Sequence, residues 1–243
     1  MISRRNILAC ACAFATLLAT PLAASPAGAQ ERLYQQRRAS PGGIGKVYMG
    51  REISQVMGWQ GAAWLEREER EREERTDLLL PMLDLKPGMV VADVGAGSGY
   101  FARRMAARVG PGGVVYAVDV QPEMVRMLEA LVKRSGLGQI KPVLGSATAV
   151  KFAAASIDLA LMVDVYHELE FPHEMLASIV QALKPGGRMV FVEYRAEDAN
   201  VPIKALHKMS EAQVKAEAAR HALTWERTHG GLPWQHAIVF RKR

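Results

Sequence analysis

Cysteine is almost absent from this sequence: among 243 residues there are only two, Cys10 and Cys12. Both lie in the first 29 residues, a segment with the features of an export signal. Once that segment is removed, disulfides, thiolate nucleophiles and cysteine-based metal sites are excluded from the remaining chain. A lipid anchor on Cys10 fits poorly, because almost no apolar stretch precedes this residue.

The excess of positive over negative charge is also small. The formal net charge is +6; Arg4 and Arg5 supply two of these charges and the first 29 residues contain no acid, so the rest of the chain carries +4. No basic stripe with interleaved aromatic residues occurs, so no nucleic-acid partner is expected. The apolar run at residues 7–20 is shorter than the roughly 20 residues that span a bilayer. No stable membrane span is therefore expected after signal cleavage.

The N-terminus itself is typical of an export signal. Residues 1–6 are short and basic, residues 7–20 are almost wholly apolar, and Pro21 interrupts the run. The small residues at 27–29 then suit a signal peptidase. These features predict a signal peptide over residues 1–29.

Residues 3–8, Ser-Arg-Arg-Asn-Ile-Leu, resemble the twin-arginine signal, which is associated with export of folded proteins. The match is imperfect, because Ile7 replaces the usual aromatic residue. We expect an exported, periplasmic protein. An uncleaved signal that anchors the chain in the membrane, or a start codon placed too early, are the alternatives.

Residues 30–75 are predicted to form an N-terminal extension. Residues 40–45 are a cluster of helix and strand breakers and predict a loop. Residues 66–75 are almost entirely Glu and Arg, which predicts a solvated helix with i,i+4 ion pairs. That helix is expected to continue to about residue 83, with a kink or a junction of two helices at Pro81.

Residues 76–243 are predicted to form the main domain, in which strand and helix patterns alternate from residue 86 onward. The predicted strands are 89–94, 114–120, 141–144, 157–163, 188–193, 223–228 and 236–241. The predicted helices are 100–109, 122–134, 172–183 and 210–222. This alternation implies an α/β fold with a mostly parallel sheet covered on both faces. Only a short loop separates the last two strands, which suggests that the last strand runs antiparallel.

A glycine-rich loop, Asp93-Val94-Gly95-Ala96-Gly97-Ser98-Gly99, follows the first of these predicted strands and precedes a helix. Glycine permits a sharp turn and lets a ligand approach the backbone. The unpaired N–H groups at the start of the next helix can hold an anion. In open parallel sheets, ligands bind at the carboxyl ends of strands, near the point where the strand order reverses. We expect this loop to lie there.

The spacing of Gly95, Gly97 and Gly99 differs from the G-x-G-x-x-G of dinucleotide-binding loops. Asp93 stands two residues before the first glycine, and Asp119 ends the next strand, where a carboxylate can accept hydrogen bonds from both hydroxyls of a ribose. NAD enzymes use an acid in the same way. Alternatively, Asp119 has only a structural role, as the cap of the following helix. Taken together, the loop and the two acids resemble motif I of the class I S-adenosylmethionine methyltransferases.

The resemblance extends over about residues 78–241, because residues 183–187 resemble the family's turn into its fifth strand and the two closing strands match its extra hairpin. It implies a Rossmann-like, doubly wound, mostly parallel seven-stranded sheet with an antiparallel last strand, preceded here by a helical extension. It also implies S-adenosyl-L-methionine as the cofactor.

The same resemblance implies which residues contact the cofactor. The glycine loop would line its methionine half, with Asp93 acting through the loop or on the cofactor's ammonium group. Asp119 would hold the ribose, and Asp164 would face the reacting end, although a helix cap is its alternative role. Ser146 stands where many members carry an acid against the adenine. The full set of implied cofactor residues is Asp93, Gly95, Ala96, Gly97, Gly99, Asp119, Gln121, Met124, Ser146, Ala147 and Asp164.

Methyl transfer is a displacement at an activated sulfonium methyl, so the cofactor carries the reactivity and the protein positions the acceptor. Tyr166, His167 and Glu168 follow the fourth predicted strand, where the family keeps acceptor-side residues. His167 can serve as a base if the acceptor must lose a proton, with Tyr166 or Glu168 nearby. A surface or helix-start histidine is the alternative.

Two further groups of residues can have either a functional or a purely structural role. Arg195, Lys204 and Lys208 lie in or beside a crossing segment expected over the pocket; they can bind an acidic acceptor or be ordinary solvated charges. Trp59 and Trp64 can form a lid or can anchor the extension to the domain.

No spacing of His, Asp and Glu resembles a metal site, and no nucleophile elbow is present. The resemblance implies methyl transfer, and a small-molecule or lipid-like acceptor is expected because no separate substrate domain is visible. One alternative is an exported S-adenosylmethionine-binding protein that does not catalyse, because the cofactor is made in the cytoplasm. The other is an NAD-linked oxidoreductase, against which the glycine spacing argues.

Overall fold

Two sheets make up the β structure of residues 33–243, the part of the chain that this computed structural model describes. The signal peptide predicted over residues 1–29 lies outside the described residues. Within the described part, no helix has both the length and the apolar character needed to cross a membrane. The division between an extension and a main domain at residue 75 stays a prediction.

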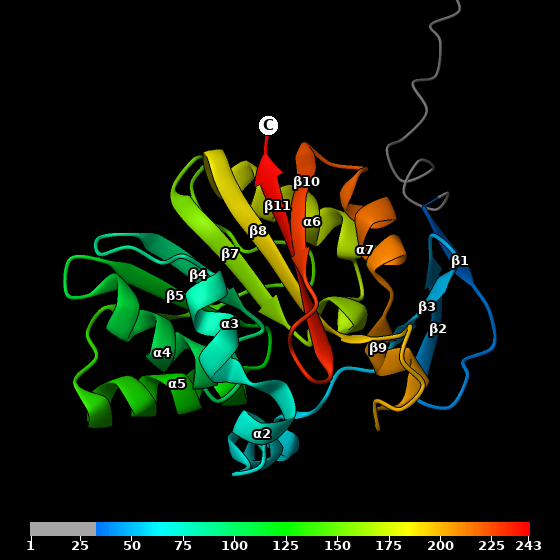
Figure 1. The fold of residues 1–243 in the computed structure, drawn as a ribbon, viewed down its shortest axis with the longest axis horizontal. Helices are drawn as coiled ribbons and strands as arrows, with labels where there is room; N and C mark the ends of the chain where they lie inside the picture. Colours follow the sequence, from blue (N-terminus) through cyan, green and yellow to red (C-terminus); the bar gives the residue numbers. More distant parts are fainter. Residues whose placement is uncertain (1–32) are drawn as a thin grey trace, which may run out of the picture. The chain divides into compact units, whose positions relative to one another are not determined.

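The larger sheet follows the order β10-β11-β8-β7-β4-β5-β6, with β9 paired to β8 beside this path (Figure 1). Its strands are β4 (Val90–Val94), β5 (Val114–Asp119), β6 (Ile140–Leu144), β7 (Ile157–Val163), β8 (Leu183–Arg195), β9 (Lys208–Met209), β10 (Leu223–His229) and β11 (Gln235–Lys242). Strand β11 pairs antiparallel with both β8 and β10, whereas β6, β5, β4, β7 and β8 are mutually parallel. The predicted doubly wound α/β fold with an antiparallel last strand is confirmed.

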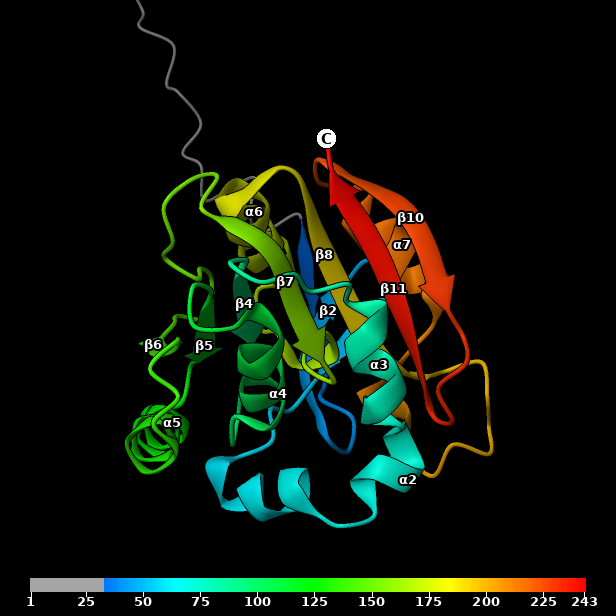
Figure 2. The same cartoon turned by 60° about the vertical axis from the view of Figure 1, so that its left-hand side comes forward.

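Helices cover both faces of this sheet. Helices α3 (Thr76–Met82), α4 (Tyr100–Val109) and α5 (Pro122–Ser135) share one core cluster, and α6 (Pro172–Ala182) and α7 (Glu211–Ala218) share the other. In Figure 2, α3 and α4 lie in front of the sheet and α6 and α7 behind it. Successive side chains of β7 alternate between the two clusters, as the period of two requires, so the strand is buried on both faces.

The helix ends follow local chemistry. The hydroxyl of Ser210 caps α7 by accepting a hydrogen bond from the Gln213 N–H at 3.1 Å. Helix α5 begins at Pro122, whose missing N–H is not needed there, and is followed by Gly136 in a left-handed conformation. These signals are local, which is why the starts of these two helices could be predicted; α7 ends at Ala218, before its predicted end at residue 222.

The N-terminal extension differs from the helical extension that we expected. It contains an antiparallel sheet of β1 (Tyr34–Gln36), β2 (Gly43–Tyr48) and β3 (Arg51–Ser54), and β2 begins inside the segment predicted as a loop. The buried carboxylate of Glu52 stabilises this arrangement by accepting hydrogen bonds from the N–H groups of Ser40 and Gly45, both at 3.0 Å. The extension therefore contains strands as well as helices, and side-chain hydrogen bonds to Glu52 stabilise the strands.

The charged segment also differs from the single solvated helix that its sequence predicted. It forms a 3-10 helix, η1 (Trp59–Glu66), followed by α2 (Arg70–Glu74) and α3. The break falls at Arg75, which has a left-handed φ of 47°, and not at Pro81, which lies inside α3 one residue before its end. Glu74 and Arg70 are buried rather than solvated.

Replacing Glu74 by Gln is expected to lower the free energy of unfolding by about 3–5 kcal/mol, because the change leaves the buried Arg70 guanidinium without its counter-charge, whereas Arg67 keeps its ion pair with Glu73. The fully buried Glu74 carboxylate accepts hydrogen bonds from Arg67 at 2.7 Å, Arg70 at 2.8 Å and the Tyr194 hydroxyl at 2.9 Å. Urea unfolding of the full chain measures the loss.

The matched control is Asp77→Asn, which breaks an ion pair with Arg75 in which both side chains are about half exposed. Exposed pairs contribute about 0–1 kcal/mol, so this variant is expected to unfold almost like the unsubstituted chain. Equal losses in the two variants would contradict the role given to the buried carboxylate.

Candidate functional site

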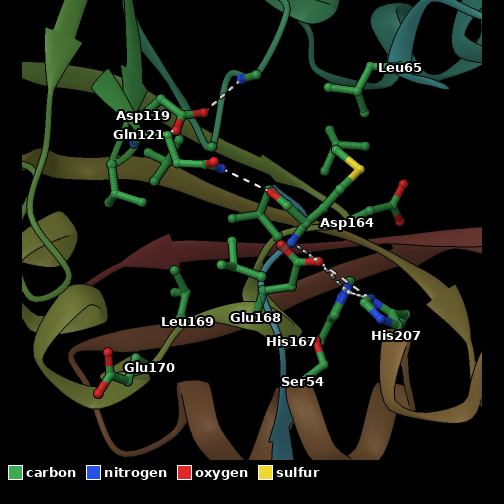
Figure 3. A pocket seen from close by; sticks show the side chains of 18 of the residues that line it. Ser54, Leu65, Asp119, Gln121, Asp164, His167, Glu168, Leu169, Glu170 and His207 are labelled. Carbon is green, nitrogen blue, oxygen red and sulfur yellow. Dashed lines mark hydrogen bonds and ion pairs between the residues drawn. The ribbon is translucent and has the colours of Figure 1, made fainter. Parts of the chain in front are cut away.

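A pocket of about 840 Å³ opens at the carboxyl ends of β4, β5 and β7. The chain passes from β4 to β5 and β6 on one side of the sheet and later to β7 and β8 on the other, so this is where the strand order reverses. Its volume falls within the range of about 300–1,000 Å³ that is usual for small-molecule sites. The extension and the segment after β8 supply further walls (Figure 3).

The glycine loop forms one wall of the pocket, as predicted. Gly95, Gly97 and Gly99 all have left-handed φ angles, between 52° and 84°. The N–H of Gly95 donates to the Val118 carbonyl at 2.8 Å, which ties the loop to β5. A Cβ built on Gly95 would lie 2.4 Å from the nearest side-chain atom of Val165. The loop therefore needs glycine at this position for both conformation and space.

Asp119 holds the loop and lines the pocket. Its carboxylate accepts hydrogen bonds from the Gly97 N–H at 3.0 Å and the Gln121 N–H at 2.9 Å. Burial raises the pKa of this carboxyl, and the backbone hydrogen bonds oppose that shift. Each carboxylate oxygen has a second lone pair, so the group can hold the loop and still accept hydrogen bonds from ribose hydroxyls.

Asp93 lies behind the loop and does not line the pocket. Its side chain is buried, it accepts a hydrogen bond from the Ala102 backbone at the start of α4, and its Oδ2 atom has no partner among the described residues. Burial raises the pKa of this carboxyl to about 7, against the opposing charge of Arg70. Of the two predicted roles of Asp93, this position favours action through the loop.

The stability of the protein is expected to fall relative to that of Asp93→Asn as the pH rises from about 4 to about 8. The carboxyl titrates near 3.9 in the unfolded chain and near 7 in the folded one, so between these values the folded state binds more protons. The full difference corresponds to about 4 kcal/mol at most. Urea unfolding of both chains across this range measures it, and parallel pH profiles would contradict it.

The structure brings only some of the remaining predicted cofactor residues to the pocket. Gln121, Met124 and Ala147 line the pocket, whereas Ser146 does not. The Ser146 hydroxyl instead exchanges hydrogen bonds with the backbone of Ala149. The predicted loop residues Ala96 and Gly99 do not line the pocket either.

Gln121 has partners that the sequence did not suggest. Its Oε1 accepts a hydrogen bond from the Trp59 N–H at 2.8 Å, and its Nε2 donates to the Met57 carbonyl at 3.0 Å. Trp64, from the same extension, lines the pocket, and Trp59 does not. The extension therefore forms part of the pocket wall and is held there by Gln121.

Asp164 lies at the end of β7 and lines the pocket, with a left-handed φ of 54°. Its Oδ2 accepts a hydrogen bond from Gln235 at 2.6 Å, and its Oδ1 has no partner among the described residues. Burial raises the pKa of this carboxyl well above its ordinary value, and the nearby Glu74 and Glu193 add to the shift. The unpartnered oxygen leaves a position for a hydrogen-bond donor from a ligand.

His167 lies in the short 3-10 helix η2 (Tyr166–Glu168) and is almost fully buried at the pocket wall. Its Nδ1 lies 2.6 Å from the carboxylate of Glu193, and its Nε2 lies 3.1 Å from Nδ1 of His207. Glu168 Oε1 is 3.4 Å from His207 Nδ1 and 3.8 Å from His167 Nε2 (Figure 3). The fold thus brings together three polar residues that line the pocket, His167, Glu168 and His207, and the buried carboxylate of Glu193.

Sequence spacing did not reveal this group, because His207 is forty residues from His167 and lies in η3 (Ala205–His207). Tyr166, predicted beside His167, is fully buried, and its ring packs against Phe191 with centroids 4.8 Å apart. It does not line the pocket. Of the three residues predicted on the acceptor side, only His167 and Glu168 therefore line the pocket.

Of the predicted cations, Lys204 lines the pocket and the other two do not. Arg195 donates to the backbone carbonyls of residues 232–235, and Lys208 donates to the carbonyl of Asp198. Lys46 lines the pocket without having been predicted; its ammonium lies 3.3 Å from the centroid of the Phe171 ring. Nothing in the sequence around Lys46 signalled this position.

Comparisons with known proteins agree with this geometry. Residues 92–191 match the family model described as a methyltransferase domain. The protein-L-isoaspartate O-methyltransferase of Methanothrix thermoacetophila is 34% identical over 113 residues, which are 46% of this chain and 51% of that protein. The crystal structure of a SAM dependent methyltransferase from Aquifex aeolicus has a TM-score of 0.73 at 22% identity, and covers 77% of this chain and 100% of that one. Over the matched residues the chain is similar to methyltransferases, and its fold is that of the Aquifex aeolicus structure.

S-adenosyl-L-methionine is the cofactor that this family implies, and the prediction made from the glycine loop is confirmed in this respect. The chain spans about half the length of curated relatives such as the one above, and 40% of the nocamycin O-methyltransferase of Saccharothrix syringae, to which it is 33% identical over 114 residues. The residues present fit this cofactor, because the pocket joins a glycine cradle, a carboxylate for a ribose and an unpartnered Asp164 oxygen.

Proposed function

We propose that this protein transfers the methyl group of S-adenosyl-L-methionine to a small-molecule or lipid-like acceptor. The observation that carries the proposal is that one pocket joins the glycine loop and Asp119 to His167 and Glu168. When bound, the cofactor supplies an activated methyl group. The chain's own residues bind the cofactor, hold the acceptor in line and keep water out.

The part of the pocket away from the glycine loop supports an acceptor with substantial apolar surface. Its lining includes Ile44, Val56, Leu169 and Met175, with Lys46 and Glu170 as charged residues. Apolar walls with few polar groups are typical of sites for small organic ligands. An amphipathic acceptor fits this lining, and its polar end would contact the histidine side of the pocket.

His167 is positioned to take a proton from such an acceptor. A carboxylate can only accept hydrogen bonds, so the short contact between Nδ1 and Glu193 assigns the ring proton to Nδ1. The lone pair of Nε2 then faces the pocket side, where His207 and Glu168 lie. In this role Glu193 orients the ring and His167 acts as the base.

Export is part of this proposal and rests on the sequence of residues 1–29. A signal of the twin-arginine kind would move the protein after folding, and a folded protein can carry a bound cofactor out of the cytoplasm. The mature protein would then act in the periplasm. An uncleaved signal would instead hold it at the membrane.

Incorporation of tritium tests the proposed activity. The full chain is incubated with S-adenosyl-L-methionine labelled in its methyl group and with a cell extract, and labelled small-molecule and lipid fractions are counted. We expect transfer that depends on the protein. Cofactor binding without any transfer would favour an exported binding protein that does not catalyse, and binding of NAD in place of this cofactor would favour an oxidoreductase.

A further inference from the structure

We propose that His167, Glu168 and His207 form a binding site for a divalent transition-metal ion at the acceptor end of the pocket. Within residues 33–243 these are the three side chains of metal-binding type whose ligand atoms all lie within 4.8 Å of one another. Two histidines and one glutamate are a donor set that Zn²⁺ uses in catalytic sites. The binding of an ion is independent of the proposed function, and only the ion's role in the reaction rests on it.

The spacing of the three ligand atoms suits a tetrahedral ion. His167 Nε2, His207 Nδ1 and Glu168 Oε1 are separated by 3.1, 3.4 and 3.8 Å. Metal bonds of about 2.0–2.2 Å at tetrahedral angles place ligand atoms about 3.3–3.6 Å apart, so the ion fits between them after shifts of a few tenths of an ångström. A compact octahedral set would require about 3 Å for every pair, which matches less well.

Glu193 provides a second, independent observation. A histidine that binds a metal usually donates its other ring N–H to a carboxylate, which fixes the tautomer and the orientation of the ring. The buried Glu193 carboxylate does this to His167 Nδ1 at 2.6 Å, and its other oxygen accepts from the Tyr166 N–H at 2.9 Å. The lone pair of Nε2 is thereby directed toward His207 and Glu168.

The site would keep an open coordination position, because only three protein ligands are present and all three line the pocket. Catalytic zinc sites have this arrangement, in which the fourth position takes water or substrate. An oxygen or nitrogen of the acceptor is the group of suitable chemistry at this end of the pocket. When the ion is bound, His167 acts as a ligand, so the proposed base role applies only to the metal-free protein.

Zinc binding to the full chain tests the inference. Untagged protein carrying Cys10→Ser and Cys12→Ser, so that thiolates outside the described residues cannot bind the ion, is stripped with a chelator and titrated calorimetrically with Zn²⁺. We expect one saturable site per chain. His207→Ala and Glu168→Gln are each expected to weaken binding at least a hundredfold, and Glu193→Gln, which removes no ligand, by about ten- to a hundredfold.

His221→Ala is the matched control, because it removes one ring of the other close histidine pair, whose centroids lie 4.7 Å apart outside the pocket. Its zinc affinity is expected to be unchanged. Absence of saturable binding, or equal loss in the control and in His207→Ala, would overturn the inference. Each sample is also titrated with S-adenosyl-L-methionine: cofactor binding without zinc binding overturns the metal site alone, and zinc binding without cofactor binding overturns the proposed function alone.

Discussion

Gly95→Ala is expected to weaken the binding of S-adenosyl-L-methionine at least about a hundredfold. The backbone of Gly95 has a φ of 78°, where a side chain adds strain of about 1–2 kcal/mol. The new methyl carbon would lie 2.4 and 2.6 Å from the two Val165 methyl carbons, so either the loop or the opposite pocket wall must move. A combined loss of about 3 kcal/mol corresponds to the expected change in affinity.

Calorimetric titration of the folded full chain measures this effect. Gly112→Ala is a suitable control, because a Cβ there would meet no atom within 4 Å and the residue has no left-handed φ. It adds the same methyl group in the turn before β5 and is expected to leave the affinity unchanged. Full affinity in Gly95→Ala, with its thermal stability retained, would contradict the placement of the cofactor against this loop.

His167→Ala is expected to lower the rate of methyl transfer by about 10²–10⁴-fold, while the affinity for the cofactor changes little. His167 is at the acceptor end of the pocket and makes no contact with the glycine loop or Asp119 among the hydrogen bonds of the described residues. The loss is expected whether the ring acts as a base or as a metal ligand. Transfer of tritiated methyl groups into a cell extract measures the rate.

His221→Ala again serves as the control, since it also removes a partly buried histidine ring but lies outside the pocket. Its rate of transfer is expected to match that of the unsubstituted protein. Undiminished turnover in His167→Ala would remove this residue from the acceptor side. Equal losses in both variants would indicate a general effect on folding instead.

The fold of the main domain could be predicted because its signals are local. Glycines flank the helix at Tyr100–Val109, and the strand at Ile157–Val163 is apolar except for Asp158; both have the predicted bounds. The strands of the extension could not be predicted in this way. They are short and contain glycine and charged residues, and the buried Glu52 that stabilises them would be expected on a surface.

In the candidate site, too, the residues with local sequence signals could be predicted and those placed by tertiary packing could not. The cofactor side was predictable because Gly95 and Gly97 lie in the loop after β4 and Asp119 ends β5, and parallel strands end at one edge of the sheet. The acceptor side depends on the packing of distant segments. His207 reaches the pocket only because its segment lies beside η2, and no periodicity in the sequence reports that contact.

Calorimetric titration of the purified full chain with S-adenosyl-L-methionine and, separately, with NAD distinguishes the two interpretations of the glycine loop, because they differ in the ligand that the loop binds. We expect saturable binding of S-adenosyl-L-methionine at one site per chain and no binding of NAD. Saturable binding of NAD with none of S-adenosyl-L-methionine would contradict this expectation.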